Sequence, residues 1–508
     1  MEFSRFIPTF AQYTMPIVYK YISISELKTK VLLLSGFIFL CHFSNAQAIS
    51  YSANVSEYGQ LKTVLGDNWD KIDSLSVTGP INAQDFRTMW ECAFYGNLSV
   101  INLENAQVEH NKIPDYALSD VNKQYWEVDQ TIYLGIKKII LPDNIVEIGK
   151  SAFNYMQLEK INLPESLRKL NIYSFANCHW LNVDPLIIPE GVIEIPTQCF
   201  VNCQNFKKLV LPTTLRVIKQ CAFYNTRMEE VAFPAGLECI ENAAFHGSGE
   251  LKKAILPNTC LELEGFAFSL CDSLKELRLP EGIKRIPANF VSYCNVLEKV
   301  NIPETVEIID DCAFQWCFAL KNIKFPEGLK TIGHTAFHYC NPDSIVFPES
   351  IQYIGGGSCR YWKNLMKIYS KSPIPPFCDE DPDNSGIYSF GGLTSTDIPV
   401  YVPVGSADLY LNAQGWSYFK NFIETDEFPE AGIYGVKIDI PNQSKVYWAN
   451  GNLNIDILND IELPVSYSVY AIDGKTVQCG YVYSPSYIIQ FPKGIYIVHV
   501  GNDVHKIL

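Results

Sequence analysis

Apolar and polar residues alternate in short runs that recur along the chain with a nearly constant period. Each run carries apolar residues at its first, fourth and sixth positions and a proline at its seventh, as in LKELRLP at 274–280. Such alternation predicts a short strand, and the proline ends it because proline cannot donate to a sheet ladder. A period of 22 to 25 residues predicts a solenoid. The prolines are Pro142, Pro164, Pro189, Pro212, Pro234, Pro257, Pro280, Pro303, Pro326 and Pro348.

A phenylalanine follows ten or eleven residues after most of these prolines. Each coil of a solenoid buries its apolar face against its neighbours, so one phenylalanine per coil predicts an internal ladder of rings. A second apolar pair in each repeat, such as Leu329 and Ile332, predicts a short strand or turn on the far side of the coil. The ladder residues are Phe153, Phe175, Phe200, Phe223, Phe245, Phe268, Phe290, Phe314 and Phe337.

The repeats resemble the BspA-like leucine-rich repeats of secreted and surface proteins of Bacteroidetes, over residues 136–370. Residues 49–135, which contain LSVTGPINAQDF at 75–86, resemble the N-terminal cap of that family. Residues 371–428, which contain VYVPVGS at 400–406, resemble its C-terminal capping unit. Caps are required because an open end would expose core and unpaired strand edge. The predicted fold is a β-rich leucine-rich-repeat solenoid with a parallel sheet.

Charge and hydropathy indicate an exported protein. Residues 31–40 form an apolar run after Lys28 and Lys30, and AQA at 46–48 follows, which together predict a signal peptide over 1–48. The run is too short for a permanent membrane anchor, and no later segment is apolar enough to span a bilayer. The net charge of −15 argues against nucleic acid as a partner. We expect a secreted or outer-surface protein.

The sixteen cysteines could form a disulfide framework or remain buried thiols. Removal of Cys41 with the signal peptide leaves fifteen, an odd number. Most stand at fixed positions in the repeat. Since free cysteine behaves as a small buried apolar residue, this regularity favours thiols. Cysteines three residues after a ladder phenylalanine are Cys178, Cys203, Cys271, Cys317 and Cys340.

No motif in the chain predicts catalysis, a metal or a cofactor. His334 and His338 stand four apart but lack the glutamate of a metalloprotease motif. The acidic run 379–386 lacks the glycine and final glutamate of a calcium loop, so a solvated acidic loop is favoured. Gly355-Gly356-Gly357-Ser358-Cys359-Arg360 has arginine where a phosphate-binding loop needs glycine. We expect a protein that is not an enzyme.

Two surface features could bind a ligand. The first is basic: residues flanking the second apolar position of each strand point out of the sheet. They are Lys138, Lys160, Lys208, Lys253, Arg278, Lys299, Lys324 and Lys367, against Glu230 and Glu276, with Val210 and Ile255 among the apolar residues interspersed. Lysine also keeps an exposed sheet soluble and unpaired, so this pattern does not by itself require a ligand.

The second feature is aromatic. Large residues follow the ladder position in the last coils and predict a ridge along one edge of the solenoid. Exposed aromatic residues are typical of protein and sugar contacts, although these rings could instead pack against the unit at 371–428. The residues are Tyr293, Trp316, Tyr339, Tyr361 and Trp362.

The tail has a different pattern. Alternating residues at 451–457, 467–470 and 495–498 predict strands, and Asp473-Gly474 predicts a tight turn, so we expect a small β-sandwich over 433–508. The segments VYAIDGKTV (469–477) and PKGIYIV (492–498) resemble the C-terminal sorting domain of the type IX secretion system. That resemblance implies a role in export or surface retention.

The family resemblance implies adhesion to host or bacterial surface proteins. A glycan-binding protein of a polysaccharide uptake system is the alternative. Aromatic residues clustered on an exposed edge would favour the glycan, whereas their burial would favour a protein bound through the lysine residues. The sequence identifies neither the ligand nor the oligomeric state.

Overall fold

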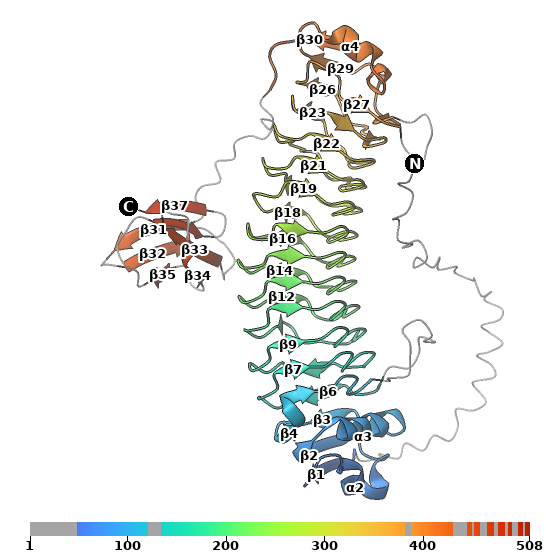
Figure 1. The fold of residues 1–508 in the computed structure, drawn as a ribbon, viewed down its shortest axis with the longest axis vertical. Coiled ribbons are helices and arrows are strands. Elements are labelled where there is room, and N and C mark those ends of the chain that lie inside the picture. Colours follow the sequence, from blue (N-terminus) through green and yellow to red (C-terminus); the bar gives the residue numbers. More distant parts are fainter. Residues whose placement is uncertain are drawn as a thin grey trace, which may run out of the picture. The chain divides into compact units, whose positions relative to one another are not determined.

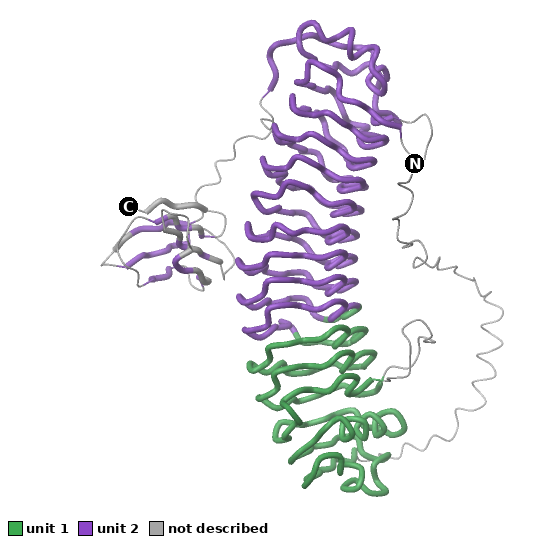
Figure 2. The backbone as a smooth tube through the Cα atoms, in the orientation of Figure 1, with its two compact units in different colours: residues 1–183, 202–205 green, residues 184–201, 206–508 purple. Residues whose placement is uncertain are grey.

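The structure is a computed structural model that describes residues 48–119, 134–380 and 388–429 and seven strands between 444 and 507. The predicted signal segment up to residue 47, the acidic residues 381–387 and the segment 430–443 lie outside the described residues. The chain divides into two compact units, residues 1–183 with 202–205 and residues 184–201 with 206–508 (Figure 2). Each is described by itself below.

Unit 1 starts with a segment of strands and helices and continues as coils of a parallel-sheet solenoid (Figure 1). All its paired strands run parallel; one sheet has the order β1-β2-β3-β6-β8, with β4 beside β2, and the other has the order β5-β7-β9. Its elements are β1 (Ser50–Asn54), α2 (Leu61–Leu65), η2 (Gly66–Asn68), β2 (Ser74–Ile81), α3 (Ala83–Phe94), β3 (Val100–Asn102), β4 (Ala106–Val108), η3 (Glu109–Asn111), β5 (Lys112–Ile113), β6 (Lys138–Ile140), β7 (Glu147–Ile148), β8 (Lys160–Ile161) and β9 (Lys169–Leu170).

A buried carboxylate organises the start of unit 1. Asp85 has no exposed surface, and its side chain accepts hydrogen bonds from the backbone N–H groups of Gly59 (2.8 Å), Leu61 (2.9 Å) and Asn82 (2.9 Å). Asn82 caps α3 in return by accepting from the N–H of Gln84. These bonds satisfy the free donors at the beginnings of α2 and α3, which an apolar cap could not do.

Unit 2 continues the same coil pattern, with one short strand on each side of a coil (Figure 1). The strands before each proline form the orders β10-β12-β14, β16-β18-β20 and β23-β26-β29-β30; the far-side strands form β11-β13-β15-β17 and β19-β21-β22-β24-β27. The first group is β10 (Leu186–Ile187), β12 (Lys208–Val210), β14 (Glu230–Ala232), β16 (Lys253–Ile255), β18 (Glu276–Arg278), β20 (Lys299–Asn301), β23 (Ser344–Phe347), β26 (Lys367–Ser370), β29 (Pro399–Val402) and β30 (Asn421–Glu424). The second is β11 (Glu194–Ile195), β13 (Val217–Ile218), β15 (Cys239–Ile240), β17 (Glu262–Leu263), β19 (Arg285–Ile286), β21 (Ile308–Ile309), β22 (Thr331–Ile332), β24 (Tyr353–Ile354) and β27 (Phe377–Cys378).

The phenylalanine ladder forms as predicted, with one exception. Every predicted ladder residue is fully buried, and the rings of Phe223, Phe245 and Phe268 stack with centroids 5.4 and 5.2 Å apart. Phe290 was wrongly assigned. The N–H of Phe268 donates to Phe290, as that of Phe245 donates to Ala267, so Phe290 occupies the alanine position and Val291 the ladder position. The Phe268 and Phe290 rings accordingly meet edge to face at 78°.

The cysteine positions have a hydrogen-bonding function. In eight coils, the buried side chain three residues after the ladder position donates to the carbonyl of the ladder residue one coil earlier; Thr226 instead donates to Phe223 of its own coil. In unit 2, Ser248, Cys271, Cys294, Cys317, Cys340 and Trp362 donate to Phe223, Phe245, Phe268, Val291, Phe314 and Phe337. In unit 1, Cys178 donates to Phe153 and Cys203 to Phe175.

These cysteines are thiols, as the sequence favoured. The fourteen cysteines of the described residues are all free, and all but Cys312 are buried. Burial raises the pKa of Cys178 to about 12, so its thiol keeps the proton that it donates. A small residue with one donor fits this position because the neighbouring carbonyl would otherwise be buried without a partner.

Residues 371–424 close unit 2 with further parallel strands and a short helix. The additional elements are β25 (Cys359–Arg360), β28 (Phe390–Gly391), α4 (Ala407–Asn412) and η4 (Trp416–Tyr418). Tyr410 and Trp416 are fully buried here; the Tyr410 hydroxyl donates to the Ser372 carbonyl (2.7 Å) and the Trp416 indole to the Pro376 carbonyl (3.1 Å). The buried polar atoms of both large side chains are therefore satisfied.

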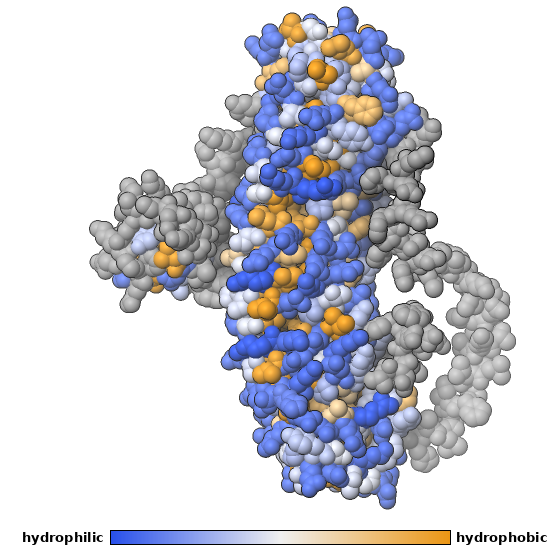
Figure 3. Space-filling model, in the orientation of Figure 1, coloured by the Kyte–Doolittle hydropathy of each residue, from blue (hydrophilic) through white to orange (hydrophobic). Residues whose placement is uncertain are grey.

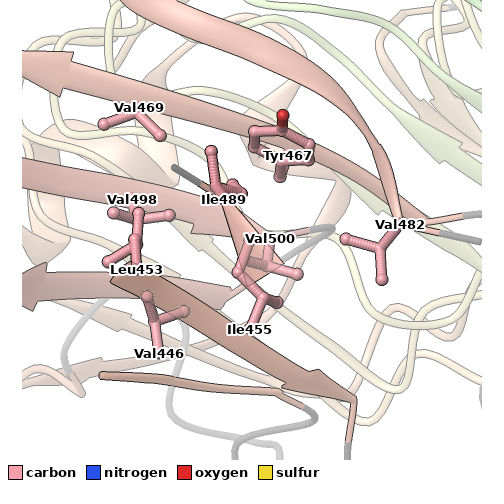
Figure 4. Packing of buried hydrophobic residues seen from close by; sticks show 9 residues of the cluster. All are labelled: Val446, Leu453, Ile455, Tyr467, Val469, Val482, Ile489, Val498 and Val500. Carbon is pink, nitrogen blue, oxygen red and sulfur yellow. The ribbon is translucent and has the colours of Figure 1, made fainter. Parts of the chain in front are cut away.

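The last strands are antiparallel. They form the orders β31-β32-β35 and β34-β33-β36-β37, from β31 (Ser444–Ala449), β32 (Asn452–Ile457), β33 (Val465–Ala471), β34 (Thr476–Val482), β35 (Ser486–Ile489), β36 (Tyr496–Val500) and β37 (Asp503–Ile507). Side chains from both sheets, among them Leu453, Ile455, Val469 and Val498, form one buried cluster (Figure 4). The sandwich and its sorting role stay predictions. In the described part of the chain, no helix has the length and apolar character needed to span a membrane.

Candidate binding surfaces

The predicted basic residues, with the exception of Lys324, lie on the strands that precede the prolines. In unit 1, Lys138 and Lys160 face each other across β6 and β8, and both are exposed. In unit 2, five residues lie on strands of the same kind, and Lys324 lies in a coil that has no strand before its proline: Lys208, Lys253, Arg278, Lys299, Lys367 and Lys324. Arg278 and Lys367 are half-buried, and the remaining four are exposed.

In unit 2 these residues form an alternating charge row rather than a uniformly basic face. Lys208 pairs with Glu230 at 3.7 Å, and Lys253 pairs with Glu276 at 3.2 Å. Register places Glu276 opposite Lys299 as well. Opposite charges on neighbouring strands stabilise the sheet and cancel much of its field, so the expected basic potential is weaker than the lysine count suggested.

An apolar column runs beside this charge row. Ile187 is 54% exposed, Val210 is 37% exposed, and Ile255 is half-buried. Figure 3 shows apolar patches between hydrophilic rows over β12 to β16. The sequence had indicated Val210 and Ile255. Ile187 was missed because its strand carries Pro185 in place of the lysine that drew attention to the others.

Four of the predicted aromatic residues form a continuous stack, here called the aromatic row: Tyr293, Trp316, Tyr339 and Tyr361. Adjacent ring centroids are 5.7, 4.3 and 4.3 Å apart in that order. The planes of Tyr339 and Tyr361 differ by 2°. Tyr293 is 40% exposed, and the other three are half-buried. The rings therefore cover one another's faces.

The aromatic row presents polar ring edges. In the part of the chain that the structure describes, the hydroxyls of Tyr293, Tyr339 and Tyr361 and the indole N–H of Trp316 have no hydrogen-bond partner. Phe318, 42% exposed, packs edge-on against Trp316 at 5.4 Å. Sequence reasoning missed Phe318, which stands two residues after Trp316. The row thus combines apolar contact area with free donors.

The backbone conformation of the aromatic row is unfavourable for bulky residues. Its four residues have φ between 61 and 65°, in the left-handed region. Earlier coils fill the same position with Tyr155, Asn177, Asn202, Asn225, Gly247 and Leu270. Asparagine and glycine tolerate that region best. A bulky residue there costs about 1–2 kcal/mol, while each ring contact returns about 0.5–1.5 kcal/mol. Stacking offsets the strain without exceeding it, so stability alone does not explain the aromatic choice.

Trp362 does not belong to the aromatic row, contrary to the sequence prediction. It has no exposed surface, and its indole donates to the Phe337 carbonyl at 2.9 Å. It occupies the donor position that cysteine fills in earlier coils. Tyr361 was correctly placed, but it also contacts the closing segment, because its ring lies where a Cβ on Gly392 would be. The alternative of packing against 371–428 thus holds for the last ring of the row.

Metal-binding groups do not gather on these surfaces. Within the described ranges, no three His, Cys, Asp or Glu side chains come close enough together to hold a metal ion. His338 lies nearly parallel to the rings of Tyr339 (4.8 Å) and Tyr361 (5.3 Å), beside that stacked pair, so it belongs with the aromatic residues.

Comparison with known proteins supports the repeat assignment. Residues 132–252, 179–298 and 238–366 match a family model described as a BspA type leucine rich repeat region, in six copies. No curated protein matches the chain.

Solved structures of bacterial repeat proteins are similar. A leucine-rich repeat protein from Bacteroides ovatus has 17% identity and a TM-score of 0.46, with 75% of this chain and 93% of that chain covered. A leucine rich cell surface protein from Faecalibacterium prausnitzii has 17% identity and a TM-score of 0.34, with 59% and 88% covered. The pneumococcal vaccine antigen PcpA has 17% identity and a TM-score of 0.34, with 75% and 84% covered. The proline-terminated strands, the phenylalanine ladder and the family match together identify residues 132–366 as a BspA-type leucine-rich repeat region folded as a parallel-sheet β-solenoid.

Proposed function

We propose that this chain is a non-enzymatic secreted or cell-surface binding protein of adhesin type, and that the aromatic row contacts a protein ligand. The observation that carries the proposal is an unbroken run of Tyr or Trp at a left-handed backbone position in four consecutive coils, a position that three earlier coils fill with Asn and one with Gly. Tyrosine and tryptophan are enriched in protein interfaces, where they combine a large apolar area with one polar group.

The stacking geometry favours a protein over a glycan on this edge. A sugar ring needs an open aromatic face to stack upon, and here neighbouring rings lie 4.3 Å apart. The rings cluster along one edge, which the sequence argument had assigned to glycan binding. Their faces are nevertheless covered, and the accessible parts are ring edges with free hydroxyl and indole donors. Backbone carbonyls and side chains of a protein can accept from such donors.

The charge row is a second, weaker candidate for protein contact. The exposed column of Ile187, Val210 and Ile255 supplies apolar area, and the flanking Lys and Glu residues would set orientation. Since Lys208 and Lys253 are paired, their change to glutamate would also place like charges across adjacent strands. Substitution of Lys208, Lys253 and Lys299 by glutamine tests the row without that repulsion.

We further propose export by the predicted signal segment, with residues 433–508 serving in export or surface retention. The resemblance of the tail to a sorting domain and its separate antiparallel strands support this assignment. Residues 1–47, which carry nearly all of the signal segment, lie outside the described residues.

The test is unbiased capture with the full mature chain. Immobilised protein is exposed to extracellular matrix proteins, plasma proteins and bacterial surface proteins, and a labelled sample is applied to a glycan array in parallel. We expect a protein partner whose binding is lost with Trp316→Asn and Tyr339→Asn together. Binding confined to neutral glycans, with no protein partner, would reject the proposal.

A further inference from the structure

A pocket of about 350 Å³ lies in unit 2 where β25, β28 and η4 meet. Its lining includes Arg360 from β25, Phe390 from β28, and Tyr388, Ser417 and Tyr418. Its volume falls within the range of small-molecule sites. Arg360 ends the Gly355–Arg360 segment, the glycine-rich motif for which the proposed protein binding gives no role.

Arg360 lacks a partner inside this pocket. Its Nε atom is buried and makes no hydrogen bond in the described part of the chain. The guanidinium lies 4.6 Å from the centroid of the Tyr361 ring. A buried donor on a charged group is costly to leave unsatisfied. The planar guanidinium fork matches a carboxylate better than any neutral acceptor.

The rest of the lining suits a small polar ring. The Tyr388 hydroxyl donates to Glu380 at 2.9 Å, and the Tyr418 hydroxyl donates to the Thr394 carbonyl, so both rings are fixed from outside. Gly392 and Gly415 have φ of 72 and 78°, and a Cβ on either would meet Tyr361 at 2.7 Å or Cys378 at 2.4 Å. Side chains are excluded there, which leaves backbone polar groups at the wall.

We propose that this pocket binds an acidic sugar, with the carboxylate on Arg360 and the sugar ring among Tyr388, Phe390 and Tyr418. A carboxylate in the pocket can pair with the Arg360 guanidinium that lines it. Sugar hydroxyls can use Ser417 and the glycine backbone, and the aromatic lining provides apolar area for the ring carbons. A peptide carboxylate would satisfy Arg360 but would leave the ring-lined part unfilled. The pocket adjoins Tyr361, the last ring of the aromatic row. The substitutions that test the row leave Arg360 and Ser417 unchanged, so each proposal can fail alone.

The experiment uses the full chain and small probes. Glucuronate and N-acetylneuraminate are titrated by calorimetry, with glucose as the neutral match and an N-acetylated dipeptide with a free carboxylate as the peptide probe. The variants are Arg360→Gln, which removes the charge, and Ser417→Phe, which fills the pocket while keeping Arg360. Arg227→Gln, on an exposed arginine outside the pocket, is the control. Melting curves establish that each variant is folded.

We expect at least one acidic sugar to bind, glucose and the dipeptide to bind at least about tenfold more weakly, and both pocket variants to lose at least about tenfold in affinity. Arg227→Gln should bind as wild type. Failure of both acidic sugars to bind, equal binding of glucose, stronger binding of the dipeptide, or full affinity in either folded pocket variant would overturn the assignment.

Discussion

The ring of Tyr339 lies parallel to that of Tyr361, with centroids 4.3 Å apart and planes 2° from parallel. Both residues hold the backbone in the left-handed region. The same turn, which holds asparagine or glycine in four earlier coils, thus positions one ring per coil at one-coil spacing. A solenoid converts a single repeat position into a linear surface in this way.

The ladder residues should be the most sensitive positions for stability. Phe245→Ala or Phe268→Ala removes a fully buried ring that stacks at 5.2 Å on its neighbour, and we expect a loss of about 3–5 kcal/mol. The exposed Phe266 provides the matched control, because Phe266→Ala should change stability little. Denaturant unfolding measures the difference. A wild-type midpoint for both ladder variants would mean that the ladder does not hold the coils together.

The donor position should accept serine and reject valine. Cys294→Ser keeps a donor for the Phe268 carbonyl, as Ser248 does for Phe223, so we expect a change of about 1 kcal/mol or less. Cys294→Val keeps the volume but leaves that carbonyl unpaired, at a cost of about 1–3 kcal/mol. Comparison of the two unfolding free energies checks the hydrogen-bond explanation. Equal stability of the two variants would mean that the cysteines at this position stabilise the coils by packing alone and not by their hydrogen bonds.

The two ion pairs of Glu229 should make the stability of the protein depend on pH. Glu229 accepts from Lys207 (2.8 Å) and Lys252 (2.6 Å), and these bonds lower its pKa from 4.5 to about 2. A carboxylate with a lowered folded-state pKa contributes stability above pH 4.5, and the contribution is lost as pH falls toward 2. The effect should be small and reduced by salt because the pairs are at the surface.

Glu229→Gln isolates this contribution. The melting temperature of wild type should exceed that of the variant near pH 6 at low salt, and the two should converge as pH falls from 4.5 to 2. Glu238→Gln, whose pair with Arg216 is longer at 3.6 Å, is the control. A constant difference across that pH interval would argue against the ion pairs.

Deletion of 433–508 should separate location from binding. We expect the truncated chain to retain the solenoid's stability and its ligand binding but to be lost from the cell surface. In a host without type IX machinery, location should not change. Fractionation of cells expressing the full and truncated chains distinguishes these cases. Loss of ligand binding on truncation would contradict both.

The repeat could be predicted from sequence because its signal is redundant. Proline, alternating apolar residues and phenylalanine all report the same period, so the coil and its ladder were placed correctly. Phe290 was misassigned because residue type was followed instead of spacing: it stands ten residues after Pro280, whereas the other ladder residues stand eleven after their prolines, which is where Val291 lies. Backbone hydrogen bonds decide this directly.

The surfaces were harder to predict because they depend on neighbours in adjacent coils. Glu230 and Glu276 were noted among the lysines in the sequence, but the face was still predicted to be basic; the structure pairs these two residues with Lys208 and Lys253 on adjacent strands. Trp362 was predicted to belong to the ridge because it is a large aromatic residue next to Tyr361. It stands one residue later in the repeat, at the buried position whose side chain donates to the previous coil. No motif in the sequence marked Arg360 as lining a pocket, because the other walls come from residues 388–418.

The affinity of the aromatic row variant for the captured protein partner tests the central claim most directly. Tyr293→Asn, Trp316→Asn and Tyr339→Asn together restore the residue that earlier coils use at this backbone position, so the chain should stay folded. Leu270→Asn, at the same position outside the row, is the matched control. We predict that the triple variant binds more than about thirtyfold more weakly while the control binds as wild type. Wild-type affinity in the folded triple variant would contradict the claim that the aromatic row binds the ligand.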